Sequence, residues 1–191
     1  MGVRQRQRLF LVPLSEESTV ETLILKRIVE VLPGNRGPTP AVDLSVVIRI
    51  DQLSQKVRRE AHRMKGFIRF QQAANGTYMA LIAPRYDVLP MIRRHFEIRY
   101  ADQDWMIYDT VRKYGLGYHG QATREIRPGS KTPTAFEQDV DAQERLCQGL
   151  WQRYYDAVTI RSRNNPALHR RQLPRRYWRY LTEKNPQGRA S

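Results

Sequence analysis

The feature that most constrains the fold is a stretch of 23 residues, 43–65, that contains neither proline nor glycine. Its apolar residues recur three or four positions apart, as on one face of a helix. They are Val46, Val47, Ile50, Leu53 and Val57. Asp43 is a suitable N-cap, and Gly66 stands where many helices end in a left-handed residue. We therefore expect one long helix over residues 43–65, with Arg58 and Arg59 nearer the solvent.

Shorter patterns predict the elements around this helix. Residues 19–32 and 88–100 have helical periodicity, and residues 33–40 hold three prolines and two glycines, which predicts a loop. Asn75-Gly76 is a strong hairpin signal between the apolar runs 67–70 and 78–82. Residues 105–109 and 115–119 predict a second hairpin.

The C-terminal third is predicted to be a polar loop followed by helices. The loop covers residues 121–133, and a long helix follows to about residue 158. Its candidate buried face consists of Phe136, Val140, Leu146, Leu150 and Tyr154. Two short helices are expected after Asn165-Pro166 and after Pro174.

Helices around antiparallel hairpins, without alternation of strand and helix, predict an α+β fold in a single domain. We expect residues 1–14 to form a basic N-terminal arm with a short extended segment, residues 15–183 the domain, and residues 184–191 a flexible tail.

The chain carries a large excess of positive charge. With 33 Lys+Arg against 19 Asp+Glu, the formal net charge is +14. The cations cluster around residues 58–65 and 161–179, and no acidic residue occurs between residues 161 and 181. Most are arginines, whose planar fork suits phosphate. The pattern favours a nucleic-acid partner over an acidic protein, an indifferent charged surface or a membrane.

Thirteen residues are candidates for binding nucleic acid, either single- or double-stranded DNA. They are Arg58, Arg59, Arg63, Lys65, Arg69, Arg163, Arg170, Arg171, Arg175, Arg176, Arg179, Tyr177 and Trp178. Arginines interleaved with aromatic rings are typical of proteins that grip phosphates and stack on unpaired bases. Alternatively, the aromatic residues anchor their segment to the core and leave only the arginines outside.

Several other classes of protein are disfavoured. The single cysteine, Cys147, excludes an internal disulfide framework, and the four histidines lack metal-ligand spacing. There is no Gly-rich phosphate loop and no cysteine triplet of the radical-SAM type, so we expect no metal or cofactor of the chain's own. No apolar run reaches the roughly 18 residues needed to span a membrane. A cytoplasmic location is expected.

Candidate general acids and bases are Asp109, Glu60, His62 and His119, with His95 as a further histidine. Asp109 shares a strand face with Trp105 and Ile107, where an apolar environment could alter the pKa of its carboxyl group. A dyad of Asp109 with His62 or His119 would suit removal of a base. The alternative is that Asp109 only pairs with one of the many arginines.

Four stretches resemble a known family: residues 57–70 (VRREAHRMKGFIRF), 82–90 (IAPRYDVLP), 105–109 (WMIYD), and 150–183, which contains RNNP and PRRYWRYLTE. The chain is similar to an uncharacterised bacterial domain labelled a probable DNA metabolism or DNA repair protein. That family occurs beside a putative radical-SAM DNA repair protein or fused to uracil-DNA glycosylases of the uracil-DNA-binding type. Its members usually carry a longer N-terminal portion. The resemblance implies a DNA context and supplies no catalytic residues.

Charge and resemblance together predict a DNA-binding accessory protein in DNA repair or base modification. A radical-SAM protein or a uracil-DNA glycosylase is the expected protein partner, and no membrane is involved. Two alternatives stay open. One is a glycosylase-like enzyme acting on a modified or damaged base, and the other is a basic adaptor for an acidic protein partner.

Overall fold

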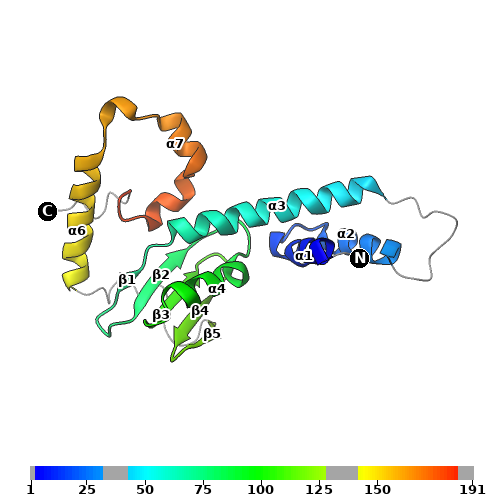
Figure 1. The fold of residues 1–191 in the computed structure, drawn as a ribbon, viewed down its shortest axis with the longest axis horizontal. Helices are drawn as coiled ribbons and strands as arrows, with labels where there is room; N and C mark the ends of the chain where they lie inside the picture. Colours follow the sequence, from blue (N-terminus) through cyan, green and yellow to red (C-terminus); the bar gives the residue numbers. More distant parts are fainter. Residues whose placement is uncertain (1–2, 32–42, 128–141, 185–191) are drawn as a thin grey trace. The chain divides into compact units, whose positions relative to one another are not determined.

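The computed structural model describes residues 3–31, 43–127 and 142–184 (Figure 1). The fold is α+β, as predicted, with several helices and one five-stranded sheet of order β1-β2-β3-β4-β5. Contacts divide this single domain into two compact units. Unit 1 contains residues 1–64 and 85–91, and unit 2 contains residues 65–84 and 92–191.

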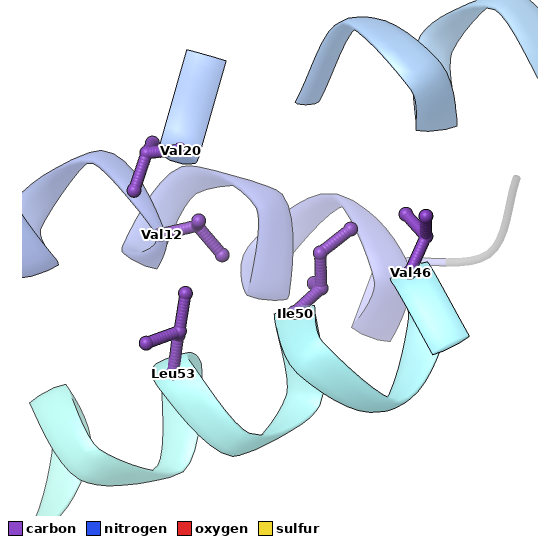
Figure 2. Close-up of a cluster of buried hydrophobic side chains, with 5 residues drawn as sticks. All are labelled: Val12, Val20, Val46, Ile50 and Leu53. Carbon is purple, nitrogen blue, oxygen red and sulfur yellow. The ribbon is translucent and has the colours of Figure 1, made fainter. Parts of the chain in front are cut away.

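Unit 1 is built from helices. α1 (Val3–Leu11) and a 3-10 turn, η1 (Pro13–Ser15), precede α2 (Val20–Val31) and α3 (Leu44–Phe67). Its core is a cluster of five buried side chains from α2, from α3 and from the residue between α1 and η1, shown in Figure 2: Val12, Val20, Val46, Ile50 and Leu53. Burial of these aliphatic groups supplies the main stabilisation of the unit.

The expected N-terminal arm is wrong for residues 3–11, which form α1. Arginine and glutamine favour helix almost as strongly as leucine does, so a basic composition does not oppose this helix. Leu11 and Val12 are buried, and the side chain of Arg8 pairs with Asp51 of α3 at 3.0 Å. This end of the chain is therefore part of the folded unit.

The long helix α3 confirms the prediction for residues 43–65. The backbone N–H of Ser45 donates to Oδ1 of Asp43 at 3.0 Å, which caps the first turn. Four of the five predicted core residues are buried, and Val47 is partly exposed. Gly66 does not end the helix: it lies within α3, and its φ is not among the positive values.

Unit 2 is built on the sheet. β1 (Gln71–Gln72) pairs antiparallel with β2 (Tyr78–Ile82), and β3 (Trp105–Asp109) pairs antiparallel with β4 (Tyr114–His119). The predicted turn at Asn75-Gly76 is present, with Gly76 at φ +83° and its N–H bonded to the carbonyl of Ala73. The strand predicted at residues 67–70 is wrong: Phe67 ends α3, and only Gln71 and Gln72 pair with β2.

Two features of the sheet differ from the prediction. β2 and β3 pair in parallel, because the chain between them runs through α4 (Leu89–Arg99) and returns in the same direction. β5 (Ala122–Ile126) replaces the first part of the predicted loop 121–133 and pairs with β4. The later residues of that loop, and the predicted loop 33–40, lie outside the described residues.

An aromatic cluster forms the core of unit 2. Trp105 is 1% exposed and stacks on Tyr118 at 5.3 Å between ring centroids. Phe96 of α4 approaches the same indole edge-on at 6.1 Å, and Phe70 lies 5.6 Å from Phe96. Edge-on and stacked contacts of this kind favour particular ring orientations, in addition to burying large apolar surfaces.

The C-terminal part of unit 2 contains α6 (Ala142–Val158), η2 (Arg161–Arg163), α7 (Pro166–Gln172) and the 3-10 helix η3 (Arg175–Tyr180). The two short helices lie where they were predicted. Gln152 of α6 donates to the carbonyl of Thr182 at 2.9 Å, and Lys184 lies over the ring of Tyr155. These contacts fix one face of α6.

The predicted buried face of α6 is wrong. Leu146, Leu150 and Tyr154 are 64%, 54% and 57% exposed, and Phe136 and Val140 lie outside the described residues. Periodicity identified an amphipathic helix, but α6 packs against residues 182–184 through a different face. None of the helices described in Figure 1 is both long and apolar enough to cross a membrane.

Candidate nucleic-acid interface

Each unit carries a set of exposed basic residues. The α3 basic face, in unit 1, consists of Arg58, Arg59, His62 and Arg63. We use the name C-terminal arginine surface for the exposed arginines of η2, α7 and η3 in unit 2, which are Arg163, Arg170, Arg171, Arg175 and Arg179.

The α3 basic face is positioned by the packing of the opposite side of the helix. Leu53, Val57, Ala61 and Met64 are buried at helical spacing. Their burial turns Arg58, Arg59 and His62 outward, where they are exposed, and Arg63 is partly exposed. The sequence pattern had predicted this exposure for both Arg58 and Arg59.

The C-terminal arginine surface is held in place by aromatic and apolar neighbours in η3. Tyr177 is 2% exposed and packs against Phe67 at 5.5 Å, and Leu181 is 1% exposed. The hydroxyl groups of Tyr180 and Thr110 are 3.0 Å apart. These contacts hold η3 against the rest of unit 2 and leave Arg175 and Arg179 exposed.

Trp178 connects η3 to α7. Its indole N–H donates to the carbonyl of Leu173 at 3.0 Å, and the ring of His169 stacks on it at 5.8 Å. The guanidinium of Arg175 lies 5.7 Å from the same ring. One face of the half-buried indole is thus occupied by His169, which limits the base stacking that the sequence had suggested.

His169 adds no positive charge to this surface at neutral pH. Partial burial and then the nearby charge of Lys184 hold the pKa of its imidazole below the ordinary 6.5. The positive potential of this surface therefore comes from its arginines.

These arginines are not neutralised by carboxylates. Within the described ranges, none of the five arginines of the C-terminal arginine surface and none of Arg58, Arg59 and Arg63 forms an ion pair. Arg127, by contrast, is exposed and pairs with Glu125 at 2.6 Å. Exposed cations without carboxylate partners keep their positive charge uncompensated and can attract phosphate.

Two predicted contacts have structural roles instead. Arg69 pairs with Glu183 at 2.8 Å, so its charge is already compensated within unit 2. Tyr177 is buried against Phe67, which corrects the expectation that its ring could stack on a base. Arg176 is exposed, and its guanidinium carbon lies over the Tyr177 ring, 4.6 Å from the ring centroid. Lys65 is exposed near the end of α3.

The proposed dyad of Asp109 and His119 is wrong. Asp109 lies at one end of β3, where it pairs with Tyr114, whereas His119 follows Tyr118, the partner of Trp105 at the other end. Four residues of strand separate the two ends by about 13 Å. His119 is exposed and its Nδ1 lies 2.6 Å from Oδ2 of Asp104.

The Asp109 carboxylate organises the turn between β3 and β4. It is fully buried and accepts hydrogen bonds from the N–H groups of Val111 and Arg112, at 2.9 and 3.2 Å. The side chain of Arg112 pairs with its other oxygen at 2.8 Å and also donates to the carbonyl of Pro84. This is the arginine partner that the sequence left as the alternative.

The remaining acid–base candidates, Glu60, His62 and His95, have surroundings of their own. Glu60 is 3% exposed and accepts a hydrogen bond from the N–H of Arg85 at 2.8 Å, which ties α3 to residues 85–91 of unit 1. His62 is on the exposed face of α3. His95 is partly buried, which lowers the pKa of its imidazole, with a further contribution from Lys65 and Arg99.

The sequence analysis missed two polar residues on the same exposed side of α3. Gln52 and Gln55 precede Arg59 by seven and four residues, a spacing that places them on one helical face. That spacing could have revealed them. Among the described residues, no group of three or more His, Cys, Asp or Glu is placed to hold a metal ion.

A protein-family model matches residues 18–183, and that family is described as "Domain of unknown function (DUF4130)". The chain belongs to the DUF4130 family. The matched range covers nearly all of the predicted domain, residues 15–183. No curated protein and no solved structure matches the chain.

Proposed function

We propose that this DUF4130 protein binds DNA through its exposed arginines and serves as an accessory protein in DNA repair or base modification. The observation that carries the proposal is the C-terminal arginine surface. Five exposed arginines have no ion-pair partners in the described structure, and η3, which carries two of them, is anchored through the buried side chains of Tyr177 and Leu181. A surface built in this way suits contact with a row of phosphates.

The repair or modification context rests on the resemblance in sequence. It includes a radical-SAM protein or a uracil-DNA glycosylase as the expected protein partner. The exposed arginines and the net charge of +14 favour DNA independently of this context.

The glycosylase hypothesis gains no support from the carboxylates. Asp109 and Glu60 are buried, and each already accepts hydrogen bonds from backbone N–H groups. A general base must reach the proton that it removes, in a plausible position of the substrate.

The adaptor hypothesis is the second candidate, and it assigns the same exposed arginines to an acidic protein partner. Leu146, Leu150 and Tyr154 also expose an apolar face on α6, which is more typical of a protein contact than of a nucleic-acid contact. Because both hypotheses use the arginines, they are separated by whether duplex DNA itself is bound.

The test compares exposed arginines with and without a carboxylate partner. The binding of a fluorescent duplex of about 20 base pairs, or two helical turns, is measured by anisotropy. We expect Arg175→Ala/Arg179→Ala to weaken binding about tenfold or more, because two phosphate contacts are lost. Arg127→Ala, whose guanidinium is paired with Glu125, should change it less than about twofold. Equal effects, or no binding by the wild type, would count against the proposal.

A further inference from the structure

The exposed side of α3 forms a polar ridge between Gln52 and Arg63. The opposite side of the same helix is buried throughout this range, through Leu53, Val57 and Ala61. Eleven helical steps of about 1.5 Å give the ridge a length of roughly 16 Å. Its outward side chains are Gln52, Gln55, Arg58, Arg59, His62 and Arg63.

The ridge carries no exposed carboxylate. Glu60 is the one acid between residues 52 and 63, and it is buried on the other side of the helix against the N–H of Arg85. Asp51, just before the ridge, pairs with Arg8 at 3.0 Å and accepts a hydrogen bond from Gln55. An anion approaching the ridge therefore meets donors and positive charge.

The ridge has a middle line and two flanks. The middle line consists of Gln52, Gln55, Arg59 and His62. At about 100° per residue, these four positions span roughly 80° around the helix axis. Arg58 and Arg63 lie on opposite sides of this line, about 140° apart. The exposed, unpaired Arg59 is thus at the centre and the other two arginines are at the edges.

We propose that α3 lies in the major groove of duplex DNA, with its middle line facing the base edges and its flanking arginines contacting the two phosphate backbones. The proposal rests on the proposed DNA-binding function and specifies its substrate as B-form duplex. The major groove is about 12 Å wide and admits an α-helix. Arg59 is suited to a bidentate contact with O6 and N7 of guanine, and Gln52 to a contact with adenine.

The same geometry selects against other nucleic acids. The major groove of A-form RNA is deep and narrow, so that side chains cannot reach its base edges. Unpaired strands are bound mainly by stacking on exposed Phe, Tyr and Trp rings, and the outward residues of the ridge include none of these three. Binding should therefore follow the order duplex DNA, then single-stranded DNA and duplex RNA.

The first test blocks one groove at a time. Binding is measured on an unmodified duplex, on the same duplex with glucosylated 5-hydroxymethylcytosine filling the major groove, and with netropsin in the minor groove. Glucosylation should weaken binding at least about tenfold, and netropsin should change it less than about twofold. If netropsin displaces the protein, or glucosylation has no effect, the groove assignment is wrong. If no duplex is bound at all, the proposed function itself fails.

The second test separates the centre of the ridge from its flanks. Methylation interference at guanine N7 is mapped on a duplex pool with a randomised central segment. The wild type should show interference that is lost in Arg59→Ala, with affinity for the selected sites reduced roughly 5- to 100-fold. Arg58→Ala and Arg63→Ala should keep the interference, and each should weaken all sequences alike.

The control variant is Arg49→Ala, on the same helix, because the guanidinium of Arg49 is already paired with Glu17. Its binding should match the wild type. Thermal melting of each variant checks that the fold is intact, as expected for exposed residues. Indistinguishable interference patterns for Arg59→Ala and Arg58→Ala would overturn the assignment.

Discussion

Arg69 and Glu183, 114 residues apart in sequence, form an ion pair of 2.8 Å that ties the segment after α3 to the C-terminal segment. The Glu183 side chain is 9% exposed and that of Arg69 is 32% exposed. An ion pair this shielded from solvent contributes more to the free energy of unfolding than a surface salt bridge does. Breaking it leaves one charged side chain poorly hydrated and without its partner.

The first prediction concerns this pair. We expect Arg69→Met to lower the free energy of unfolding by about 1–3 kcal/mol, because the Glu183 carboxylate loses its guanidinium partner. Urea unfolding measures the change. The double variant Arg69→Met/Glu183→Leu should recover part of the loss, since neither charge then remains. Strictly additive losses in the double variant would show that the two side chains do not interact.

The second prediction is a pH dependence of stability. Burial raises the pKa of Glu183, but its hydrogen bond and charge interaction with Arg69 outweigh this, so the pKa lies below the ordinary 4.5. A pKa lowered in the folded state contributes stability above the unfolded-state value, and that stability is lost as the pH falls through the folded-state value.

The pH dependence is checked with Glu183→Gln as the reference. The difference in urea midpoint between wild type and variant should be constant above about pH 5 and should shrink as the pH falls below about 4.5. A difference that grows on acidification would mean that the folded state raises the pKa of Glu183.

The third prediction tests the role of Asp109. Asp109→Asn should lower the free energy of unfolding by about 1–3 kcal/mol, because Arg112 loses the carboxylate that pairs with it at 2.8 Å. Thermal denaturation of the purified variant measures this. If instead the variant melts like the wild type but no longer releases base from uracil-containing DNA, Asp109 is catalytic and the glycosylase hypothesis is correct.

The fourth prediction separates folding from binding within η3. Tyr177→Ala should destabilise the protein by about 3–5 kcal/mol, because a ring that is 2% exposed leaves a cavity. Arg175→Ala should change stability by less than about 0.5 kcal/mol while weakening DNA binding. Calorimetry and anisotropy on the same two variants make the comparison. A stable Tyr177→Ala protein with impaired binding would return Tyr177 to the binding surface.

Much of the fold was predictable where one local signal dominates. The periodicity from Val46 to Val57 predicted α3, and Asn75-Gly76 predicted the first turn of the sheet. α1 was missed because the charge of residues 4–8 obscured their good helix propensity. β5 was missed because its pairing with β4 is made by the backbone, and Gly117 leaves room for the side chain of Ile126.

The candidate site was predictable in its charge and less so in its contacts. A run without acidic residues predicts exposed arginines, as Arg175 and Arg179 confirm. That Arg69 is neutralised could not be predicted, because Glu183 lies 114 residues away in sequence. The exposure of Leu150 was missed because a helical pattern predicts an apolar face but does not show which part of the protein covers that face.

Whether the exposed arginines bind the phosphates of DNA is measured by the salt dependence of duplex binding. The logarithm of the association constant is plotted against the logarithm of the salt concentration for the wild type and for a variant in which Arg163, Arg170, Arg171, Arg175 and Arg179 are replaced by alanine. At about −0.9 per phosphate, five contacts predict a wild-type slope of about −4 or steeper, and a slope shallower by as much as about 4 in the variant. A wild-type slope near zero, or the same slope in both proteins, would contradict the account.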